Sequence, residues 1–165
     1  MSFSIRPTTP ADAAFVMELF SLEHVRTFTH GPTSVDDFLR ALERGRSENC
    51  IVERDGAPFG NLMLDSALDW LAELRVIAVR EPRCGAGAFA LSWALERAFA
   101  EHGVHRFYLE AVASNVGARA LYARFGLRAE GCFRDGYRAD SGLYEDLVPY
   151  ALLAHEYAAL RATIV

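Results

Sequence analysis

The sequence predicts an α/β fold in which helices cover both faces of a mixed, mostly antiparallel central sheet. Turn signals at Asp55-Gly56 and at 140–142 separate apolar segments and therefore predict antiparallel hairpins. An apolar strand, a glycine-containing loop, an amphipathic helix and another strand follow one another over 70–112, which predicts one parallel pair. A chain of 165 residues has the size of one domain with a substantial core. We therefore predict a single domain over 1–165.

Helix and strand signals alternate in the N-terminal half. Thr9 and Pro10 suit the N-cap and the first position of a helix, and Ser34 suits the cap of a second helix over 35–46. The segment 23–34 between these helices is predicted to be irregular. Strands are expected at 3–7, 50–54, 59–64 and 70–79. The last of these ends in the apolar run 76–79, which is typical of a strand buried on both faces.

The C-terminal half begins with the clearest helical pattern in the chain. Apolar residues repeat every three or four positions from Gly87 to Phe99, and the helix should end at His102-Gly103. The remaining elements are predicted as a strand over 106–112, a helix over 115–125 closed by Gly126, strands over 127–134 and 143–153, and a short helix over 154–165.

The composition argues against several classes of protein. The net charge is −5, so we expect no nucleic-acid partner, because phosphate neutralisation needs a basic face. All 17 basic residues are arginine, which excludes catalytic lysines and the lysine of a Walker loop. The three cysteines have no CxxC spacing, so neither a metal site nor disulfides are expected. No apolar run reaches the roughly 18–20 residues that span a bilayer, so we expect a cytoplasmic protein without a membrane partner.

A candidate anion-binding loop connects the apolar strand to the long helix. Gly85 and Gly87 allow backbone N–H groups to approach an anion closely, and a helix N-terminus adds partial positive charge. Arg80 and Arg83 could add charged groups. The loop is therefore a candidate site for a diphosphate, although the two glycines could instead make only a tight turn.

The helix over 115–125 carries a candidate catalytic group. Asn115 and Tyr122 are almost two turns apart, so they project from one face about 10 Å from each other. Ala118 lies between them and leaves room for a ligand. A phenol has a pKa near 10 and can act as a general acid toward a departing thiolate. Tyr122 could alternatively be a core tyrosine.

Two carboxylates are candidates for a general base. Glu110 lies inside an apolar strand, where loss of hydration raises a carboxyl pKa toward the useful range. Glu73 lies near the start of the preceding strand and is a candidate on similar grounds. Glu110 could instead form a structural ion pair with Arg106 or Arg119. The sequence does not choose between the two candidate bases.

Taken together, these segments resemble the GNAT superfamily of N-acetyltransferases over nearly the whole chain. Ile77-Ala78-Val79 followed by Gly85-x-Gly87 resembles its acetyl-CoA loop. Asn115-x-x-Ala118-x-x-Leu121-Tyr122-x-x-Phe125-Gly126-Leu127 resembles its next motif. Within the superfamily, the segments at 109–126, 135–137 and 144–146 resemble the ribosomal-protein N-terminal acetyltransferases and their small-molecule relatives. The resemblance implies the acyl-CoA N-acyltransferase fold.

The resemblance also implies roles for the matching residues. Asn115 would bond the cofactor arm, Tyr122 would protonate the coenzyme A thiolate, and Glu110 matches the base of some relatives. Pantetheine would pair with the backbone of Ile77, Ala78 and Val79. The pyrophosphate would rest on the N–H groups of Arg83, Cys84, Gly85, Ala86, Gly87 and Ala88.

One position departs from the family pattern. Pro82 stands where the family usually has Gln or Arg, three residues before the first glycine. A register that begins at Arg83 would place Ala86 and Ala88 at the glycine positions. The register with Gly85 and Gly87 is preferred, because the apolar stripe then begins three and four residues after the second glycine.

The resemblance implies an enzyme that moves an acetyl group from acetyl-CoA, its co-substrate, to a primary amine in a ternary complex. The amine could belong to a protein N-terminus or to a small molecule, and 23–34, with His24 and His30, would help to select it. A non-catalytic acyl-CoA-binding module is the alternative. The apolar segment 154–165 could support a homodimer or could pack on its own domain.

Overall fold

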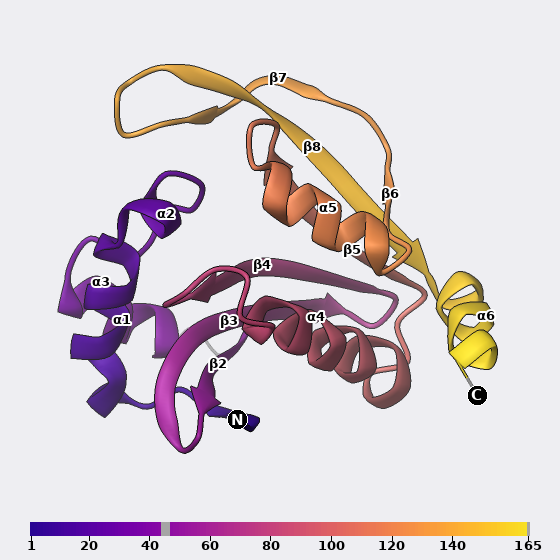
Figure 1. Cartoon of the computed structure of the whole chain (residues 1–165), viewed down its shortest axis with the longest axis horizontal. Coiled ribbons are helices and arrows are strands. Elements are labelled where there is room, and N and C mark those ends of the chain that lie inside the picture. The colour runs from indigo at the N-terminus through magenta and orange to yellow at the C-terminus, as the bar shows by residue number, and fades with distance from the viewer. Residues whose placement is uncertain (44–46, 165) are drawn as a thin grey trace. The chain divides into compact units, whose positions relative to one another are not determined.

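The computed structural model describes residues 1–43 and 47–164, and its elements divide into two units (Figure 1). Met1–Asp65 and Leu74–Ala94 form the first unit. Ser66–Glu73 and the described residues from Leu95 onward form the second. The predicted ends of two helices, at 44–46 and at 165, lie outside the described residues.

Antiparallel strands form the sheet of the first unit. Strand β1 (Phe3–Pro7) pairs with β2 (Ser47–Arg54), and β2 pairs with β3 (Ala57–Leu68). The predicted hairpin turn is present, since Asp55 and Gly56 have positive φ angles of 51° and 81°. The hairpin is longer than predicted, because its polar ends continue the ladder as far as the pair Ser47 and Asp65. Strand β4 (Leu71–Val79) lies next to β3.

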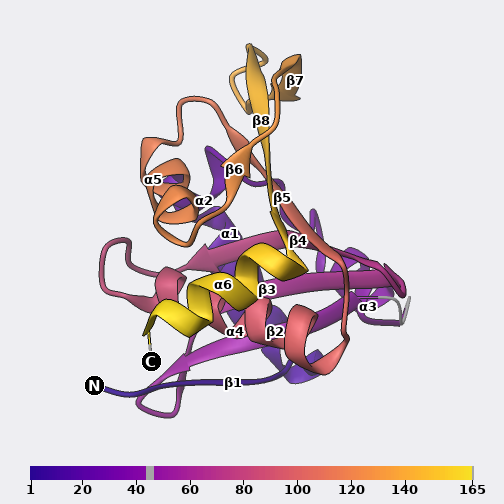
Figure 2. The ribbon, with the colours of Figure 1, turned by 90° about the vertical axis from the view of Figure 1, so that its right-hand side faces the viewer.

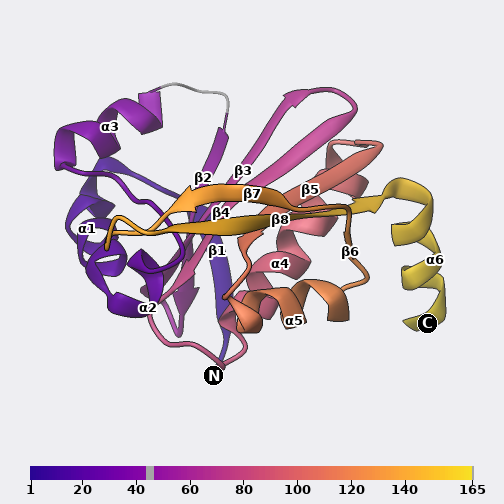
Figure 3. The same ribbon diagram turned by 90° about the horizontal axis from the view of Figure 1, so that it is seen from above.

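Helices cover both faces of these strands. Helices α1 (Ala13–Ser21), α2 (Glu23–Arg26) and α3 (Val35–Glu43) lie together on one face (Figure 3). Their buried side chains form one core cluster with strand residues; its members are Val16, Leu19, Phe20, Val25, Phe38, Ile51 and Ala78. The prediction that 23–34 is irregular throughout is therefore wrong, because Val25 anchors a short helix in this core.

The opposite face of the first unit is covered by the start of helix α4 (Ala86–Glu96). The ring of Phe89 on α4 lies 5.6 Å from the ring of Phe3, measured between centroids. Phe3 pairs with Arg54 of β2. Because side chains alternate along a strand, Arg54 and Val52 lie on one face of β2 and Ile51 lies on the other. The two helical layers therefore contact different faces of β2.

A buried carboxylate fixes the connection from β1 to α1. Arg6 donates hydrogen bonds of 2.7 and 2.9 Å to Asp12, and the backbone N–H and hydroxyl of Thr9 donate bonds of 2.8 and 2.9 Å. The bonds from Arg6 are the largest cause that lowers the pKa of Asp12 to about 2. Thr9 is the predicted cap residue, and the helix begins as a 3₁₀ turn, Pro10–Asp12.

Asp12→Asn should reduce the free energy of unfolding at pH 7 by about 2 kcal/mol, which corresponds to the fall in pKa from 3.8 to about 2. A carboxyl whose pKa falls on folding stabilises the protein above its unfolded pKa and loses this effect as the pH falls through the folded pKa. The difference between wild type and variant should therefore narrow from about pH 4 downward. Urea unfolding between neutral and acidic pH measures it, with Asp36→Asn as an exposed control. A difference independent of pH would contradict the expectation.

In the second unit, Leu71–Glu73 of β4 pairs in parallel with β5 (Arg106–Val112), as the order of elements predicts. Strand β8 (Tyr144–Leu153) pairs antiparallel with β5. Figure 2 shows β6 (Arg128–Ala129) and β7 (Phe133–Arg138) beside β8, and each pairs with it antiparallel. The prediction of one strand over 127–134 is wrong, because β6 and β7 contact different stretches of β8.

Helices α5 (Val116–Arg124) and α6 (Ala154–Ile164) complete the second unit. The turn after α5 contains Gly126, whose φ is 83°. A glycine in this left-handed conformation closes the helix, as predicted. A Cβ at Gly126 would lie only 2.5 Å from Cδ1 of Leu160, so α6 lies directly against this turn. Tyr157 and Arg161 of α6 also donate hydrogen bonds of 2.8 and 2.7 Å to Glu96. The C-terminal helix therefore packs on its own unit.

The long helix ends at the predicted position, but its last turn is a π-helix and not an α-helix. A π-helical segment, Arg97–Glu101, follows α4, and Gly103 has a φ of 65°. The predicted apolar stripe is buried at Ala90, Leu91, Ala94, Leu95 and Ala98. Across the described ranges, no helix is both long enough and apolar enough to cross a bilayer.

Candidate active site

At the end of β4, the backbone N–H and C=O groups of successive residues point to opposite edges of the strand. The N–H of Arg80 donates to the carbonyl of Phe59 at 2.8 Å, and a Cβ on Gly60 would lie 2.6 Å from the carbonyl oxygen of Ala78. Ala78 and Arg80 therefore direct their polar groups toward β3, where only glycine fits at position 60. Because successive residues alternate in this direction, Ile77 and Val79 direct theirs toward the other edge.

A histidine from α2 contacts this other edge. His24 Nε2 lies 3.0 Å from the carbonyl oxygen of Val79. Because a carbonyl can only accept, Nε2 must be the protonated nitrogen that donates. His24 therefore lies beside the last residue of β4, whereas His30, the other candidate histidine of 23–34, lines a cavity in the first unit.

The loop after β4 turns sharply into the N-terminus of α4. Arg83 and Gly85 have φ angles of 62° and 93°, a region that favours glycine. The N–H of Phe89 donates to the carbonyl of Gly85 at 3.0 Å. The three N–H groups at 86–88 precede this donor, so they have no carbonyl partner within the helix. This geometry, with the helix dipole behind it, suits an anion.

The arginines around the loop differ in whether their guanidinium groups already contact a carboxylate. Arg80 forms an ion pair of 3.0 Å with Glu18 on α1, and because both side chains are exposed this pair contributes little. Arg54 is held by Glu81 at 2.8 Å. Arg83 is exposed and makes no ion pair with the residues that the structure describes. It is therefore the arginine of the loop that is available to a ligand.

In the second unit, α5 presents the predicted phenol. Burial is the first cause that raises the pKa of Tyr122 to about 12, and the neighbouring Tyr150 adds to it. The two rings meet edge to face, with centroids 5.7 Å apart. The Tyr122 hydroxyl makes no hydrogen bond within 1–43 and 47–164. The group is thus an undissociated phenol whose proton is available to a ligand.

Asn115 and Arg119 shape the region around this phenol. Asn115 Oδ1 caps α5 by accepting a hydrogen bond of 3.1 Å from the N–H of Ala118, which leaves its amide nitrogen to contact a ligand. Arg119 Nε donates to the Tyr150 hydroxyl at 3.1 Å, and the same guanidinium donates to the carbonyl of Ala113 at 2.8 Å. Arg119 therefore orients the ring against which Tyr122 packs, a role that the sequence did not predict.

The two candidate bases lie on one face of the β4–β5 pair. Glu73 lies opposite Tyr108, and Glu110 follows Tyr108 by two residues, so its side chain is on the same face. Partial loss of hydration raises the pKa of Glu110, and the charge of Glu73 raises it further. The pKa is therefore raised in the predicted direction and by the predicted cause, although the Glu110 side chain itself is exposed between the buried residues Leu109 and Ala111.

The alternative role of Glu110 as an ion-pair partner is wrong. Arg106 binds Glu130, and Arg119 has the two partners named above. Within the described part of the chain, no group of three or more His, Cys, Asp and Glu residues is placed to hold a metal ion. The cofactor-binding candidates at 77–79 and 83–88 belong to the first unit, and Glu73, Glu110, Asn115 and Tyr122 belong to the second.

This mixed α/β architecture and its strand–loop–helix segment define an acyl-CoA N-acyltransferase fold. The chain belongs to the acetyltransferase (GNAT) family, whose family model matches residues 13–127. No curated protein sequence matches the chain.

Solved structures of acetyltransferases are similar to nearly the whole chain. One described as a probable acetyltransferase is 27% identical, with a TM-score of 0.80 and coverage of 93% of this chain and 94% of that one. The ribosomal-protein-S18-alanine N-acetyltransferase from Escherichia coli is 25% identical, with a TM-score of 0.75 and the same coverage. Spermidine N-acetyltransferase from Vibrio cholerae, in complex with CoA and spermine, is 19% identical, with a TM-score of 0.84 and coverage of 94% and 98%.

Proposed function

We propose that this protein transfers the acetyl group of acetyl-CoA to a primary amine by direct attack in a ternary complex. The observation that carries the proposal is the family match over 13–127, which includes both the loop 83–88 and most of the chemistry on β5 and α5. The backbone and side-chain geometry of each unit supports a part of this reaction.

The first unit would hold the cofactor. Ile77 would pair with pantetheine, since its polar groups point away from β3. The carbonyl of Val79 is bound by His24, which leaves its N–H for the cofactor, and Ala78 lies in the core cluster between these two residues. The loop residues 83–88 would hold the diphosphate through their N–H groups, with the guanidinium of Arg83 adding charge. The Val79 N–H would polarise the thioester carbonyl and stabilise the oxyanion that forms during attack.

The second unit would transfer protons. The attacking amine loses a proton to Glu110 or Glu73, directly or through one water, and its nitrogen forms the new bond to the carbonyl carbon. The carbon–sulfur bond then breaks, and Tyr122 donates its proton to the leaving sulfur. A pKa of about 12 keeps Tyr122 protonated near neutral pH, as this role requires.

The two carboxylates should be distinguishable in a pH–rate profile. Glu110→Gln should lower kcat/KM by about 10²-fold at neutral pH and abolish the acidic limb if Glu110 is the base. Glu73→Gln should move that limb to lower pH, because removal of the Glu73 charge removes one cause that raises the pKa of Glu110. The opposite assignment follows if the acidic limb disappears with Glu73→Gln and persists with Glu110→Gln.

Release of coenzyme A in the presence of a panel of amines tests the proposed function. The panel should include an alanine-initiated peptide and spermidine, because the similar solved proteins are described as acetylating such acceptors. Thermal shift with acetyl-CoA, ATP and NAD provides the binding measurement, since a ligand that binds only the folded state raises the Tm. Tight acetyl-CoA binding with no turnover on any amine would instead identify a binding module without catalytic activity.

A further inference from the structure

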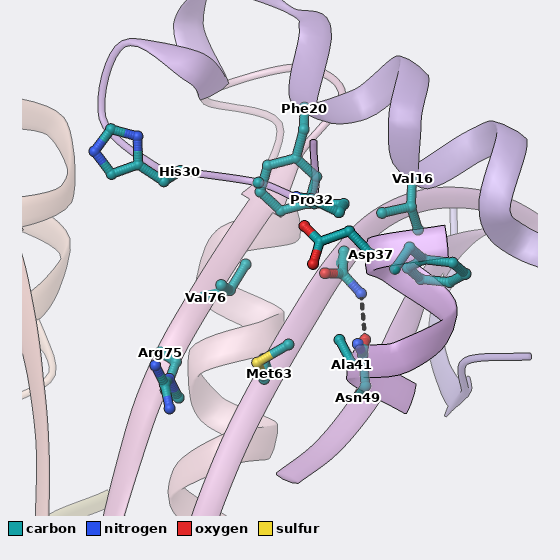
Figure 4. Close-up of a pocket in the computed structure, with 13 residues that line it drawn as sticks. Val16, Phe20, His30, Pro32, Asp37, Ala41, Asn49, Met63, Arg75 and Val76 are labelled. Atoms are coloured by element: carbon teal, nitrogen blue, oxygen red, sulfur yellow. Dashed lines mark hydrogen bonds between the residues drawn. The ribbon is translucent and has the colours of Figure 1, made fainter. Parts of the chain in front are cut away.

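Helices α1 and α3, the segment 30–32 and strands β2–β4 of the first unit line a partly open cavity of about 250 Å³ (Figure 4). Much of its wall is apolar and comes from Val16, Phe20, Phe38, Met63 and Val76. Its polar lining includes Asp37, Asn49 and Asn61, together with His30 and Arg75. A small apolar cavity with a few convergent polar groups is the usual form of a ligand site.

Asn61 and Asp37 present hydrogen-bond acceptors in this lining, whereas the guanidinium of Arg75 lies 3.8 Å from the carboxylate of Asp65. Asn61 is 2% exposed, and its Nδ2 donates to Asn49 Oδ1 at 2.7 Å and to the carbonyl of Cys50 at 3.0 Å. The Cys50 bond fixes the orientation of this amide, because a carbonyl cannot donate. Asn61 Oδ1 accepts no hydrogen bond from any residue in the described ranges, so an acceptor on the cavity wall is left for a ligand.

The carboxylate of Asp37 supplies a second acceptor from α3, and Figure 4 shows it directed into the cavity. Its Oδ2 accepts a hydrogen bond of 3.1 Å from the N–H of Thr33, and its Oδ1 lies 4.0 Å from the guanidinium of Arg40. An exposed pair at this distance contributes little. Oδ1 of Asp37 therefore remains able to accept a hydrogen bond from a donor in the cavity.

We infer that this cavity binds the non-reacting end of the acceptor, and that this end carries a second ammonium or another N–H donor on a short apolar body. The inference rests on the proposed function. Val76, which lines the cavity, lies three residues before Val79 on the same strand, which is about 10 Å at the rise of a β-strand. An acceptor of about this length would reach from the cavity to a thioester held at Val79.

The substrate preference can be measured with two probes of equal chain length, diaminooctane and octylamine. Binding to the full chain with saturating coenzyme A is measured by calorimetry, and acetylation is measured by coenzyme A release in the presence of acetyl-CoA. The wild type should bind diaminooctane about tenfold more tightly than octylamine, since a hydrogen bond to a charged group is worth about one factor of ten or more. Equal binding of the two probes, or binding of neither, would overturn the inference.

Asp37→Asn keeps the size of the side chain and removes its charge, so the preference for diaminooctane should fall to about threefold or less. Asp36→Asn makes the same charge change on the exposed side of α3 and should leave the preference unchanged. Ala41→Met should fill the cavity and weaken the binding of both probes. A folded Ala41→Met variant with wild-type binding, or an undiminished preference in Asp37→Asn, would contradict the inference.

Binding and turnover together separate this inference from the proposed function. A preference that depends on Asp37 without acetylation of either probe would support the cavity as a ligand site and would count against acetyl transfer to these amines. Acetylation without a preference that depends on Asp37 would support acetyl transfer and would overturn the cavity as the acceptor subsite.

Discussion

Tyr122→Phe should lower kcat for acetyl transfer by about 10²–10³-fold and leave the Kd for acetyl-CoA within about twofold of the wild type. The substitution removes one hydroxyl and retains the ring that packs edge-on against Tyr150. Because that hydroxyl has no hydrogen-bond partner within the described residues, its loss should not disturb the fold. The effect should therefore appear in the chemical step, where the departing sulfur needs a proton.

Steady-state coenzyme A release and calorimetry with acetyl-CoA measure the two quantities. Tyr157→Phe is the matched control, because it also removes a phenol hydroxyl, one that donates to Glu96 at 2.8 Å. This control should lower the Tm and leave kcat close to that of the wild type. Wild-type turnover by Tyr122→Phe would remove Tyr122 from the mechanism.

Ala88→Pro should raise the Kd for acetyl-CoA by about tenfold or more. Position 88 lies in the first turn of α4, before the first intrahelical donor at Phe89, so a proline there costs the helix no hydrogen bond. The substitution removes one N–H from the proposed diphosphate cradle. A hydrogen bond to a charged group is worth about 1.5–3 kcal/mol, which sets the expected size of the effect.

Ala88→Val provides the control, since it adds bulk at the same position and retains the N–H. It should change the Kd for acetyl-CoA by less than about threefold. Calorimetry with both variants, after circular dichroism has shown that α4 is intact, makes the comparison. Equal affinities of the proline and valine variants would show that the N–H of residue 88 does not contact the cofactor.

Local signals predicted most of the fold. The Asp55-Gly56 turn and the glycine that ends each of two helices fix backbone angles within a few residues, and the structure has positive φ at Gly56, Gly103 and Gly126. The division of 127–134 into β6 and β7 could not be predicted in the same way. It depends on which residues of β8 lie opposite, and this register is set by contacts between segments distant in the sequence.

In the candidate site, too, features set by neighbouring residues were predicted, and features set by contacts between distant segments were not. The strand–loop–helix order predicted the sharp turn into the N-terminus of α4 at 83–88, because a strand, a glycine and a helix start are adjacent in the chain. Neither the ion pair of Arg80 with Glu18 nor the bond from Arg119 to Tyr150 left a sequence signal. Asp37 likewise appeared as one acidic residue in the first turn of a helix, and only the packing of α1, α3 and the strands shows that it lines a cavity.

The contact between Leu160 and Gly126 has a consequence for synthesis of the protein. Leu160 leaves the ribosome roughly thirty residues after Gly126, which takes on the order of a few seconds at 5–20 residues per second. During that interval the helix that carries the phenol has left the ribosome, but the apolar cover over its last turn has not yet emerged. A ribosome paused within this interval would therefore carry a chain whose second unit is still unfinished.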